Sequence, residues 1–228
     1  IVWESTTKWI HGSGTTVGGI LVDGGTFPWD HPDADYPEIA GENPAFGIDF
    51  TERFGERAFA VAARQRAVRS LGNQQSPFDA WVTLQGLETL PLRMEKHCEN
   101  ARAVAEFLRD HDEVGWVLYP GFEDHQTHEN ASKYLDGGYG GMITFGLADG
   151  FEASKALCNE VDLASFLANI GDAKTLIIHP ASTTHAQLSE EEQRAGGVRP
   201  DMLRLSVGIE DAEDIVADLE QGIERATR

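Results

Sequence analysis

Short apolar runs alternate with amphipathic segments through the second half of the chain. Four runs have the length and the bounding turn residues of buried strands: Val114 to Tyr119, "GGMITFGL" (140–147), "TLIIH" (175–179) and "MLRLSVG" (202–208). Apolar residues recur at helical spacing around Phe151 to Asn159 and in the closing segment "DAEDIVADLEQGIERA" (211–226), which has an acidic first turn. Strands interleaved with helices predict an α/β or α+β domain here.

The first half of the chain has a different pattern. The stretch "GGILVDGG" (18–25) is typical of a buried strand ended by a glycine turn, so the chain is expected to begin inside a fold. Residues 26–55 are rich in Pro, Gly and Asp and predict a surface excursion. Helical periodicity follows in residues 54–72 and 76–111, with Ser76-Pro77 as a helix start. Pro91 is predicted to bend or divide the second helix.

The charge balance narrows the function classes. The 228 residues include 38 acidic and 18 basic side chains, which gives a formal net charge of −20. Nucleic acid is an unfavourable partner for such a surface, because its phosphates need basic side chains to neutralise them. The acids are spread along the chain, and we interpret them as an adaptation to high salt, where ions screen the self-repulsion. No apolar run approaches the length of a membrane span.

Cysteine usage and the first residues indicate a cytoplasmic protein. Cys98 and Cys158 are far apart and form no CxxC pair, so neither a disulfide framework nor a zinc ribbon is indicated. The opening "IVWESTTK" has no basic start and no apolar signal core, so export is not expected. His125 and His128 in "EDHQTHEN" resemble half of a metal site, but a third ligand at suitable spacing is not evident, and we predict a polar loop without a metal.

One lysine stands out in the stretch "STTKWIHGSG" (5–14). Hydroxyl side chains precede Lys8 and glycines follow it. A lysine amine can form a Schiff base with an aldehyde cofactor, and hydroxyls at Ser5 and Thr7 can donate to the phosphate of that cofactor. Glycines after Lys8 let the backbone approach a ligand closely. On spacing alone we favour a surface lysine beside a turn, since S-x-T-K is a short and common pattern. No glycine order typical of a nucleotide loop follows.

Longer stretches decide between these interpretations. "STTKWIHGSGTTVGGILVDGG", "QSPFDAWVTLQGLETLPLRMEKHCENA", "LANIGDAKTLIIHPASTTHAQL" and "LRLSVGIEDAEDIVADLEQGI" occur in this order. Together they resemble the Cys/Met-metabolism family of fold-type-I pyridoxal phosphate (PLP) enzymes, and within it the O-acetylhomoserine sulfhydrylases. The resemblance implies a C-terminal portion of that fold: residues 1–90 end the large cofactor domain and begin an interdomain helix, and residues 91–228 form a smaller α/β domain. Family members also have a comparably long N-terminal half, which cannot be placed in this chain.

The resemblance also implies roles for individual residues. Lys8 would carry the cofactor, Ser5 and Thr7 would contact its phosphate, and Asn169 and Arg204 would bind the α-carboxylate of an amino-acid substrate. An arginine fork suits a carboxylate, because it donates two parallel hydrogen bonds. Without the family motif, we favour a strand-end ion pair of Arg204 with nearby acids, including Glu210 and Asp211. His179 and His185 are expected to pack near the substrate rather than to act in catalysis.

The reaction implied by the resemblance is γ-replacement, in which sulfide replaces the acetate of O-acetylhomoserine to give homocysteine. Cystathionine γ-synthase or γ-lyase activity remains an alternative, because these reactions share the same lysine and carboxylate arginine. A truncated, non-catalytic folding or assembly module is a second alternative, since the family's ring-stacking aromatic and ring-nitrogen aspartate are not found here. Family resemblance further implies a homo-oligomer, usually a dimer of dimers with shared active sites.

Overall fold

The computed structural model describes residues 1–33 and 35–228, which divide into two compact units. The first unit contains residues 1–7 and 16–84, and the second contains residues 8–15 and 85–228. The chain therefore enters the second unit briefly at Lys8 before it returns to the first. The predicted domain boundary between residues 90 and 91 stays a prediction.

The first unit is built mainly from turns and short helices. Its regular elements are β1 (Val2–Glu4), β2 (Ile20–Val22), α1 (Phe50–Phe54), a 3-10 turn (Gly55–Arg57), α2 (Ala58–Ala63), a π-helical stretch (Arg64–Arg69) and the first part of α3 (Pro77–Glu88). A small apolar core forms where Phe50 packs with Ala58 and Ala62. The helix predicted over residues 54–72 is therefore present as a series of short helical segments.

Strand β2 corrects one expectation. The sequence predicts a buried strand at residues 20–22, and the strand forms, but Leu21 is 54% exposed. Among the described residues, β2 pairs with β1 alone, in an antiparallel ladder that places Trp3 opposite Leu21. A two-stranded ladder with no layer packed on it leaves both of its faces open, which is why the apolar side chains are not covered.

The second unit contains a five-stranded mixed sheet with helices packed on it. Its elements are α4 (Leu90–Asp110), β3 (Val114–Leu118), α5 (His128–Tyr134), β4 (Met142–Leu147), α6 (Phe151–Glu160), β5 (Ser165–Phe166), β6 (Leu176–Ile178), a 3-10 turn (Pro180–Ser182), α7 (Glu190–Ala195), β7 (Met202–Ser206) and α8 (Ala212–Ala226). The strand order is β3-β4-β7-β6-β5, and all neighbours are antiparallel except β5 and β6.

Most of these elements agree with the sequence pattern. Pro91 does divide the helical region: α3 ends at Glu88, and α4 begins at Leu90 with the proline in its first turn. At the start of α3, Ser76 accepts a hydrogen bond from the backbone N–H of Asp79, as expected of an N-cap. The polar loop predicted around "EDHQTHEN" is in part wrong, because His128 begins the short helix α5.

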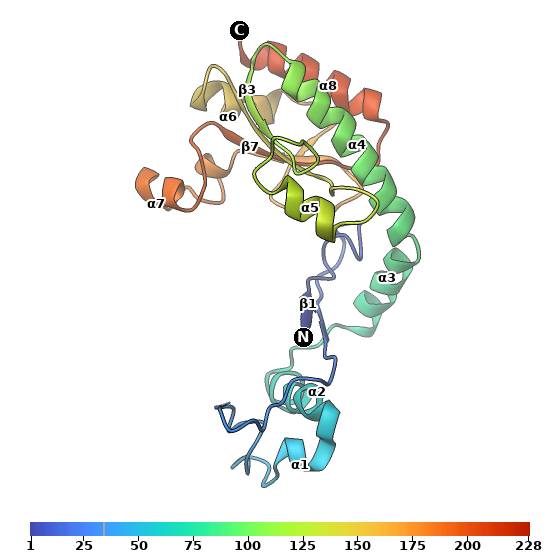
Figure 1. The fold of residues 1–228 in the computed structure, drawn as a ribbon. Coiled ribbons are helices and arrows are strands. Elements are labelled where there is room, and N and C mark those ends of the chain that lie inside the picture. Colours follow the sequence, from blue (N-terminus) through green and yellow to red (C-terminus); the bar gives the residue numbers. More distant parts are fainter. Residues whose placement is uncertain (34) are drawn as a thin grey trace. The chain divides into compact units, whose positions relative to one another are not determined.

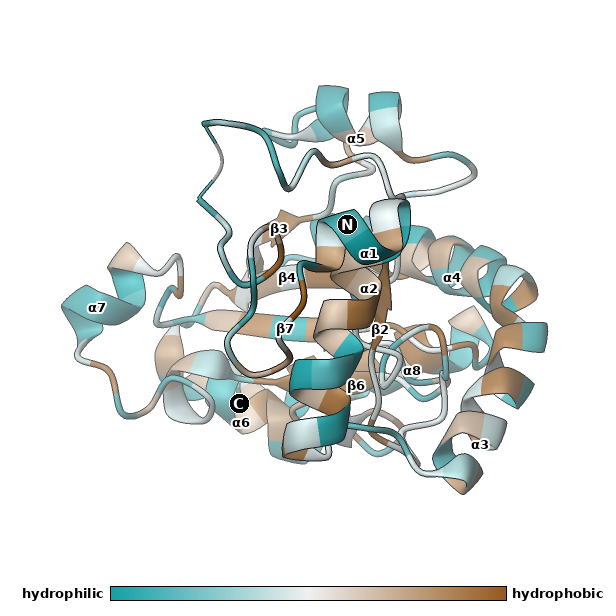
Figure 2. Cartoon of the chain, turned by 90° about the horizontal axis from the view of Figure 1, so that it is seen from below, coloured by the Kyte–Doolittle hydropathy of each residue, from teal (hydrophilic) through white to brown (hydrophobic). Residues whose placement is uncertain are grey.

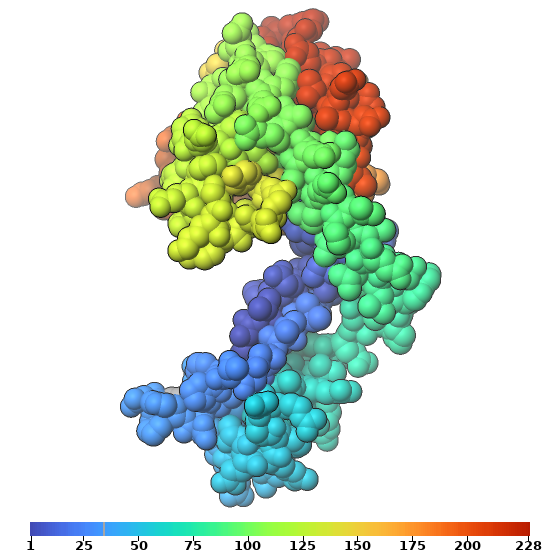
Figure 3. Space-filling model, turned by 45° about the vertical axis from the view of Figure 1, so that its right-hand side comes forward, coloured from blue at the N-terminus to red at the C-terminus, as the bar shows by residue number. Residues whose placement is uncertain are grey.

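The core of the second unit lies between one face of the sheet and the helices α4, α6 and α8. Ile143 of β4, Leu205 of β7 and Ile177 of β6 form a cross-strand row in this core. Within this unit α8 lies beside α4 (Figures 1 and 3), and Leu219 and Val104 contribute to the same buried cluster. Figure 2 shows the largely apolar colour of β4 and β7 against the hydrophilic α7. None of the described helices is long and apolar enough to cross a membrane.

Candidate active site

Lys8 starts a tight turn at the edge of the second unit. The backbone N–H of Gly12 donates to the carbonyl of Lys8 at 2.8 Å, and Gly12 and Gly14 have φ values of +77° and +64°. Such positive values favour glycine, because a Cβ atom strains the left-handed region. The half-buried Lys8 directs its amine to Asn169, whose Oδ1 accepts a hydrogen bond from Nζ. The structure thus joins two residues that the sequence singled out separately.

The loop that carries Asn169 is held against both the lysine segment and β7. The N–H of Gly171 donates to Ser206 Oγ at 3.0 Å, and the N–H of Ala173 donates to the carbonyl of Gly12 at 2.9 Å. Gly171 has φ of +73°, and a Cβ atom there would lie 2.6 Å from the backbone nitrogen of Trp9. The close approach of these two backbones therefore requires glycine at position 171.

Arg204 lies on the face of β7 that is turned away from the helical core. Leu203 and Leu205 on either side of it are fully buried in that core, whereas Arg204 pairs across the sheet with Thr144 and Ile178. Burial lowers the pKa of the half-buried Arg204 guanidinium below its usual value. A partly dehydrated guanidinium binds a carboxylate more strongly than one surrounded by water does.

The alternative role for Arg204, an ion pair with a neighbouring acid, is not what the described residues show. No carboxylate among them lies within salt-bridge distance of Arg204, and Glu210 accepts hydrogen bonds from the N–H and hydroxyl of Thr175 at 2.7 and 2.9 Å. Within the described ranges, Lys8 likewise has no carboxylate partner. Both cationic groups are therefore available for a ligand.

Ser5 and Thr7 belong to the first unit. The Thr7 hydroxyl donates to the carbonyl of Gly18 at 3.2 Å and accepts from its N–H at 3.0 Å, while Ser5 is exposed. Their roles as phosphate contacts stay a prediction.

Two other histidines that the sequence singled out, His128 and His179, are hydrogen-bonded to groups of the protein itself. His128 Nδ1 donates to the carbonyl of Pro120 at 2.8 Å, and the described residues include no group of three metal-ligating side chains. His179 is fully buried, with its two ring nitrogens 2.8 Å from Ser182 Oγ and from the carbonyl of Pro200. Burial lowers the pKa of His179, so it is neutral near pH 7.

Three functional candidates on α4 were missed by the sequence analysis. Arg93 contacts the backbone of the lysine segment, whereas His97 and Asn100 contact the end of β7. His97 and Asn100 are 0% and 1% exposed. The available signal was a histidine and an asparagine on the helix face that also carries buried residues such as Ala101, a placement that requires hydrogen-bond partners.

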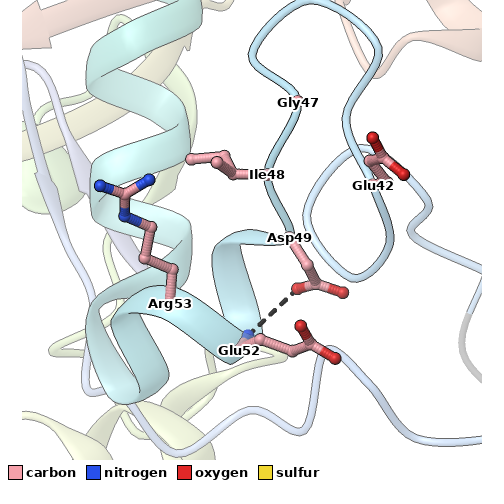
Figure 4. A pocket seen from close by; sticks show the side chains of 6 residues that line it. All are labelled: Glu42, Gly47, Ile48, Asp49, Glu52 and Arg53. Carbon is pink, nitrogen blue, oxygen red and sulfur yellow. Dashed lines mark hydrogen bonds between the residues drawn. The ribbon is translucent and has the colours of Figure 1, made fainter.

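The first unit has a pocket of its own, with a volume of about 520 Å³. Its lining residues are Glu42, Gly47, Ile48, Asp49, Glu52 and Arg53 (Figure 4). Asp49 caps α1 through Oδ1, which accepts from the N–H groups of Thr51 and Glu52. This carboxylate therefore has a structural role. The pocket belongs to the first unit, whereas Lys8, Asn169 and Arg204 belong to the second.

Several known proteins are similar to this chain in sequence and fold. Homocysteine synthase of Schizosaccharomyces pombe is 49% identical over 227 residues, and O-acetyl-L-homoserine sulfhydrylase 1 of Thermus thermophilus is 48% identical over 224 residues. These alignments cover 99% and 98% of this chain but only 53% of each relative. The chain thus spans about half the length of the curated relatives it matches.

A solved structure extends the likeness to the fold. A Campylobacter jejuni protein assigned as an O-acetylhomoserine (thiol)-lyase, which carries N'-pyridoxyl-lysine-5'-monophosphate, superposes with a TM-score of 0.89 and 36% sequence identity. The match covers 97% of this chain and 53% of that chain, and it confirms the predicted α/β fold class. The Cys/Met metabolism PLP-dependent enzyme family matches residues 1–224, and the chain belongs to this family.

Proposed function

We propose that this chain is the lysine-bearing half of a PLP-dependent enzyme that replaces the acetate of O-acetylhomoserine with sulfide and produces homocysteine. The observation that carries the proposal is the contact between Lys8 and Asn169. Ser206 of β7 holds the loop of Asn169, and none of the described carboxylates pairs with Arg204 of the same strand. The sulfhydrylase and homocysteine synthase names of relatives at 48% and 49% identity support the choice of substrate.

The residues present fit pyridoxal phosphate. The amine of Lys8 is hydrogen-bonded to a neutral amide, and no described carboxylate pairs with it. Lys8 would hold the cofactor covalently, and the hydroxyls of Ser5 and Thr7 would contact its phosphate. When bound, the cofactor supplies an electron-withdrawing ring that stabilises negative charge on the carbon next to the substrate's amino group.

Substrate binding and proton transfer would be carried out by side chains of this chain. Arg204 would hold the substrate carboxylate through two parallel hydrogen bonds, and Asn169 would add a third polar contact. The Lys8 amine would move protons at the α- and β-carbons of the substrate, because an amine, unlike a guanidinium or an amide, can both accept and return a proton. Asn169 accepts a hydrogen bond from Lys8 and would thus restrict where the amine points, which would help to orient it toward these carbons.

We also propose the setting in which this enzyme works. The protein would be a cytoplasmic homotetramer, a dimer of dimers, active at high salt and supplied with sulfide and the amino-acid substrate. Cys98 and Cys158 are both free thiols, which supports a reducing compartment. Large apolar side chains on α3, Phe78 and Trp81, are 68% and 56% exposed, which supports further association. The net charge of −20 supports the salt preference.

A product assay tests the proposed function. The protein is supplied with PLP, O-acetylhomoserine and sulfide, and acetate and homocysteine are measured in equal amounts if the proposal is correct. Replacing sulfide with cysteine tests for cystathionine γ-synthase activity, and cystathionine as sole substrate tests for γ-lyase activity. Faster turnover in either of these assays contradicts the sulfhydrylase assignment. No product from any substrate, with Lys8 carrying the cofactor, supports the non-catalytic module instead.

A further inference from the structure

One face of α4 carries three polar side chains at helical spacing. Arg93, His97 and Asn100 follow one another at i, i+4 and i+7, so they lie along a single stripe of the helix. Their partners belong to two segments that are far apart in sequence. The three residues are called the α4 stripe below.

Arg93 holds the segment that follows Lys8. Its guanidinium donates to the carbonyls of Trp9 at 2.7 Å, Ile10 at 3.1 Å and Gly86 at 2.7 Å. Burial lowers the pKa of this guanidinium, which nevertheless remains charged at neutral pH. Arg93 therefore makes charge-assisted hydrogen bonds to backbone oxygens that adjoin the lysine.

His97 contacts both segments at once. Its ring packs edge-on against Trp9 with the ring centroids 5.0 Å apart, and Nδ1 lies 2.7 Å from the carbonyl of Val207. A carbonyl can only accept, so Nδ1 carries the proton of this hydrogen bond. Nε2 is buried without a partner among the described residues, and burial lowers the pKa of the ring. His97 is therefore a neutral, fully buried link between the lysine segment and the residue after β7.

Asn100 holds the chain that leaves β7. Its Nδ2 donates to the carbonyls of Gly208 at 3.0 Å and Glu210 at 2.7 Å. The Glu210 carboxylate in turn accepts from Thr175. The β7 strand, which carries Arg204, is thereby tied to the same helix face as the lysine segment.

Ala173 closes this arrangement into a ring. Its N–H donates to the carbonyl of Gly12 at 2.9 Å, and its carbonyl accepts from the N–H of Ile209 at 2.9 Å. The lysine segment and the end of β7 are thus bonded to each other through Ala173 on one side and through α4 on the other. A closed ring restricts the separation of Lys8 and Arg204 more than either connection does alone.

We propose that the α4 stripe is a set of positioning residues that fixes the separation of Lys8, which carries the cofactor, and Arg204, which binds the substrate carboxylate. The inference rests on the proposed function for the roles of these two residues. The α4 stripe contacts backbone carbonyls and the ring of Trp9, so the role assigned to it is positioning and not catalysis. It acts by holding the two backbones, and misplacement of reacting groups by about 1 Å can reduce a rate about 100-fold.

Amide hydrogen exchange tests the coupling independently of catalysis. The N–H groups of Gly12 and Ile209 donate to Lys8 and Ala173 within the ring, and the N–H of Val207 donates to Gly141, so these amides report the two segments. Asn100→Asp keeps the shape of the side chain but loses both donors, and Arg93→Lys keeps the charge but loses the fork. We expect each variant to speed exchange about 10-fold in both segments, because the ring couples them.

Two controls separate coupling from general loss of stability. Glu99→Gln changes an exposed residue next to Asn100 on another face of α4, and Ile215→Val makes a small cavity in the core under α8, to which Ile215 belongs. Glu99→Gln should leave amide exchange unchanged. Ile215→Val should not speed the exchange of the ring amides more than that of the α8 amides. If Asn100→Asp speeds exchange at Val207 but not at Gly12, or if all amides of the unit change equally, the α4 stripe is only a local structural contact and the proposal is wrong.

The loaded enzyme gives the second readout. We expect Asn100→Asp, Arg93→Lys and His97→Leu to lower kcat about 10- to 100-fold, while PLP still attaches to Lys8 and KM for the amino-acid substrate changes less than kcat. His97→Asn, which retains a donor for Val207, should restore much of kcat. Unchanged kcat in all variants overturns the proposal. If the wild type does not carry PLP on Lys8, the proposed function fails, and hydrogen exchange alone decides whether the α4 stripe couples the two segments.

Discussion

The amine of Lys8 donates a hydrogen bond to Asn169, 161 residues further along the chain. The bond joins a turn after β1 to a loop that is fixed on β7 by Ser206. Arg204, two residues before Ser206, therefore extends from the same face of the strand as the side chain that holds this loop. These hydrogen bonds thus connect the turn that carries Lys8, the loop that carries Asn169 and the strand that carries Arg204.

Replacing Arg204 should weaken substrate binding without affecting the cofactor. Arg204→Leu removes both hydrogen bonds to the carboxylate, and KM for the amino-acid substrate should rise about 100-fold. Arg204→Lys keeps the charge but not the two parallel hydrogen bonds, so its KM should lie between those of the wild type and Arg204→Leu. Steady-state kinetics and the extent of PLP attachment to Lys8 measure these effects. Arg225→Lys, an exposed change, is the control, and an unaltered KM in Arg204→Leu would exclude the carboxylate role.

Gly171→Ala tests the close approach of the loop to the lysine segment. A methyl group at position 171 would lie 2.6 Å from the nitrogen of Trp9, whereas at Gly197 the space is open. Both glycines have positive φ, +73° and +80°, so both substitutions include the same backbone strain. Urea unfolding should show Gly171→Ala to be less stable than Gly197→Ala by about 1–3 kcal/mol. Equal loss of stability in the two variants would show that the loop can move away.

Stability should fall on mild acidification because of buried neutral histidines. Burial lowers the pKa of His97 and His179 below the 6.5 of a free side chain, so the unfolded chain binds protons first as the pH falls. The free energy of unfolding should therefore be constant between about pH 7 and 8 and decrease below about 6.5, by at most about 1.4 kcal/mol per pH unit for each histidine. The decrease should end once the pKa of the folded state is passed.

His97→Asn measures this contribution. The variant keeps a donor for Val207 but cannot titrate, so the slope of unfolding free energy against pH should become shallower between pH 5.5 and about 6.5. His31→Asn removes a histidine with a 54% exposed side chain and serves as the control. A slope that His97→Asn leaves unchanged would mean that the folded protein protonates His97 as readily as the unfolded chain does.

Salt should stabilise the protein. The formal net charge of −20 produces self-repulsion that weakens as the Debye length falls from about 10 Å at 0.1 M salt to about 3 Å at 1 M. The urea midpoint should therefore increase from 0.1 to 1 M KCl with the slope of the transition unchanged. Equal or greater stability in dilute buffer would contradict the proposed adaptation to high salt.

The sequence predicted those parts of the fold that depend on local pattern. The strands at 142–147 and 202–206 and the division of the helix at Pro91 all follow from apolar spacing and from proline chemistry. The exposure of Leu21 was not predictable, because an apolar run indicates a strand without showing what covers it. Helix α5 was missed because its residues, "HENASKY", have no apolar periodicity.

The candidate site could be predicted only in part from the sequence, for a related reason. Lys8, Asn169 and Arg204 were recognised through motifs that resemble a family, and the contact of Lys8 with Asn169 depends on tertiary packing between distant segments. Arg93, His97 and Asn100 carry no short-range signal beyond polar residues on a buried helix face. Their backbone partners follow from the packing of α4 against the turn after Lys8 and the end of β7, which no local pattern encodes.

The most direct test of the central claim identifies which lysine binds PLP. The protein is mixed with PLP, reduced with borohydride and digested, and the modified lysine is located by mass spectrometry. Modification should concentrate on Lys8, disappear in Lys8→Arg and persist in Lys96→Arg, which alters a partly exposed lysine of α4. Modification spread over several lysines, or unchanged in Lys8→Arg, would contradict the assignment of Lys8 as the cofactor lysine.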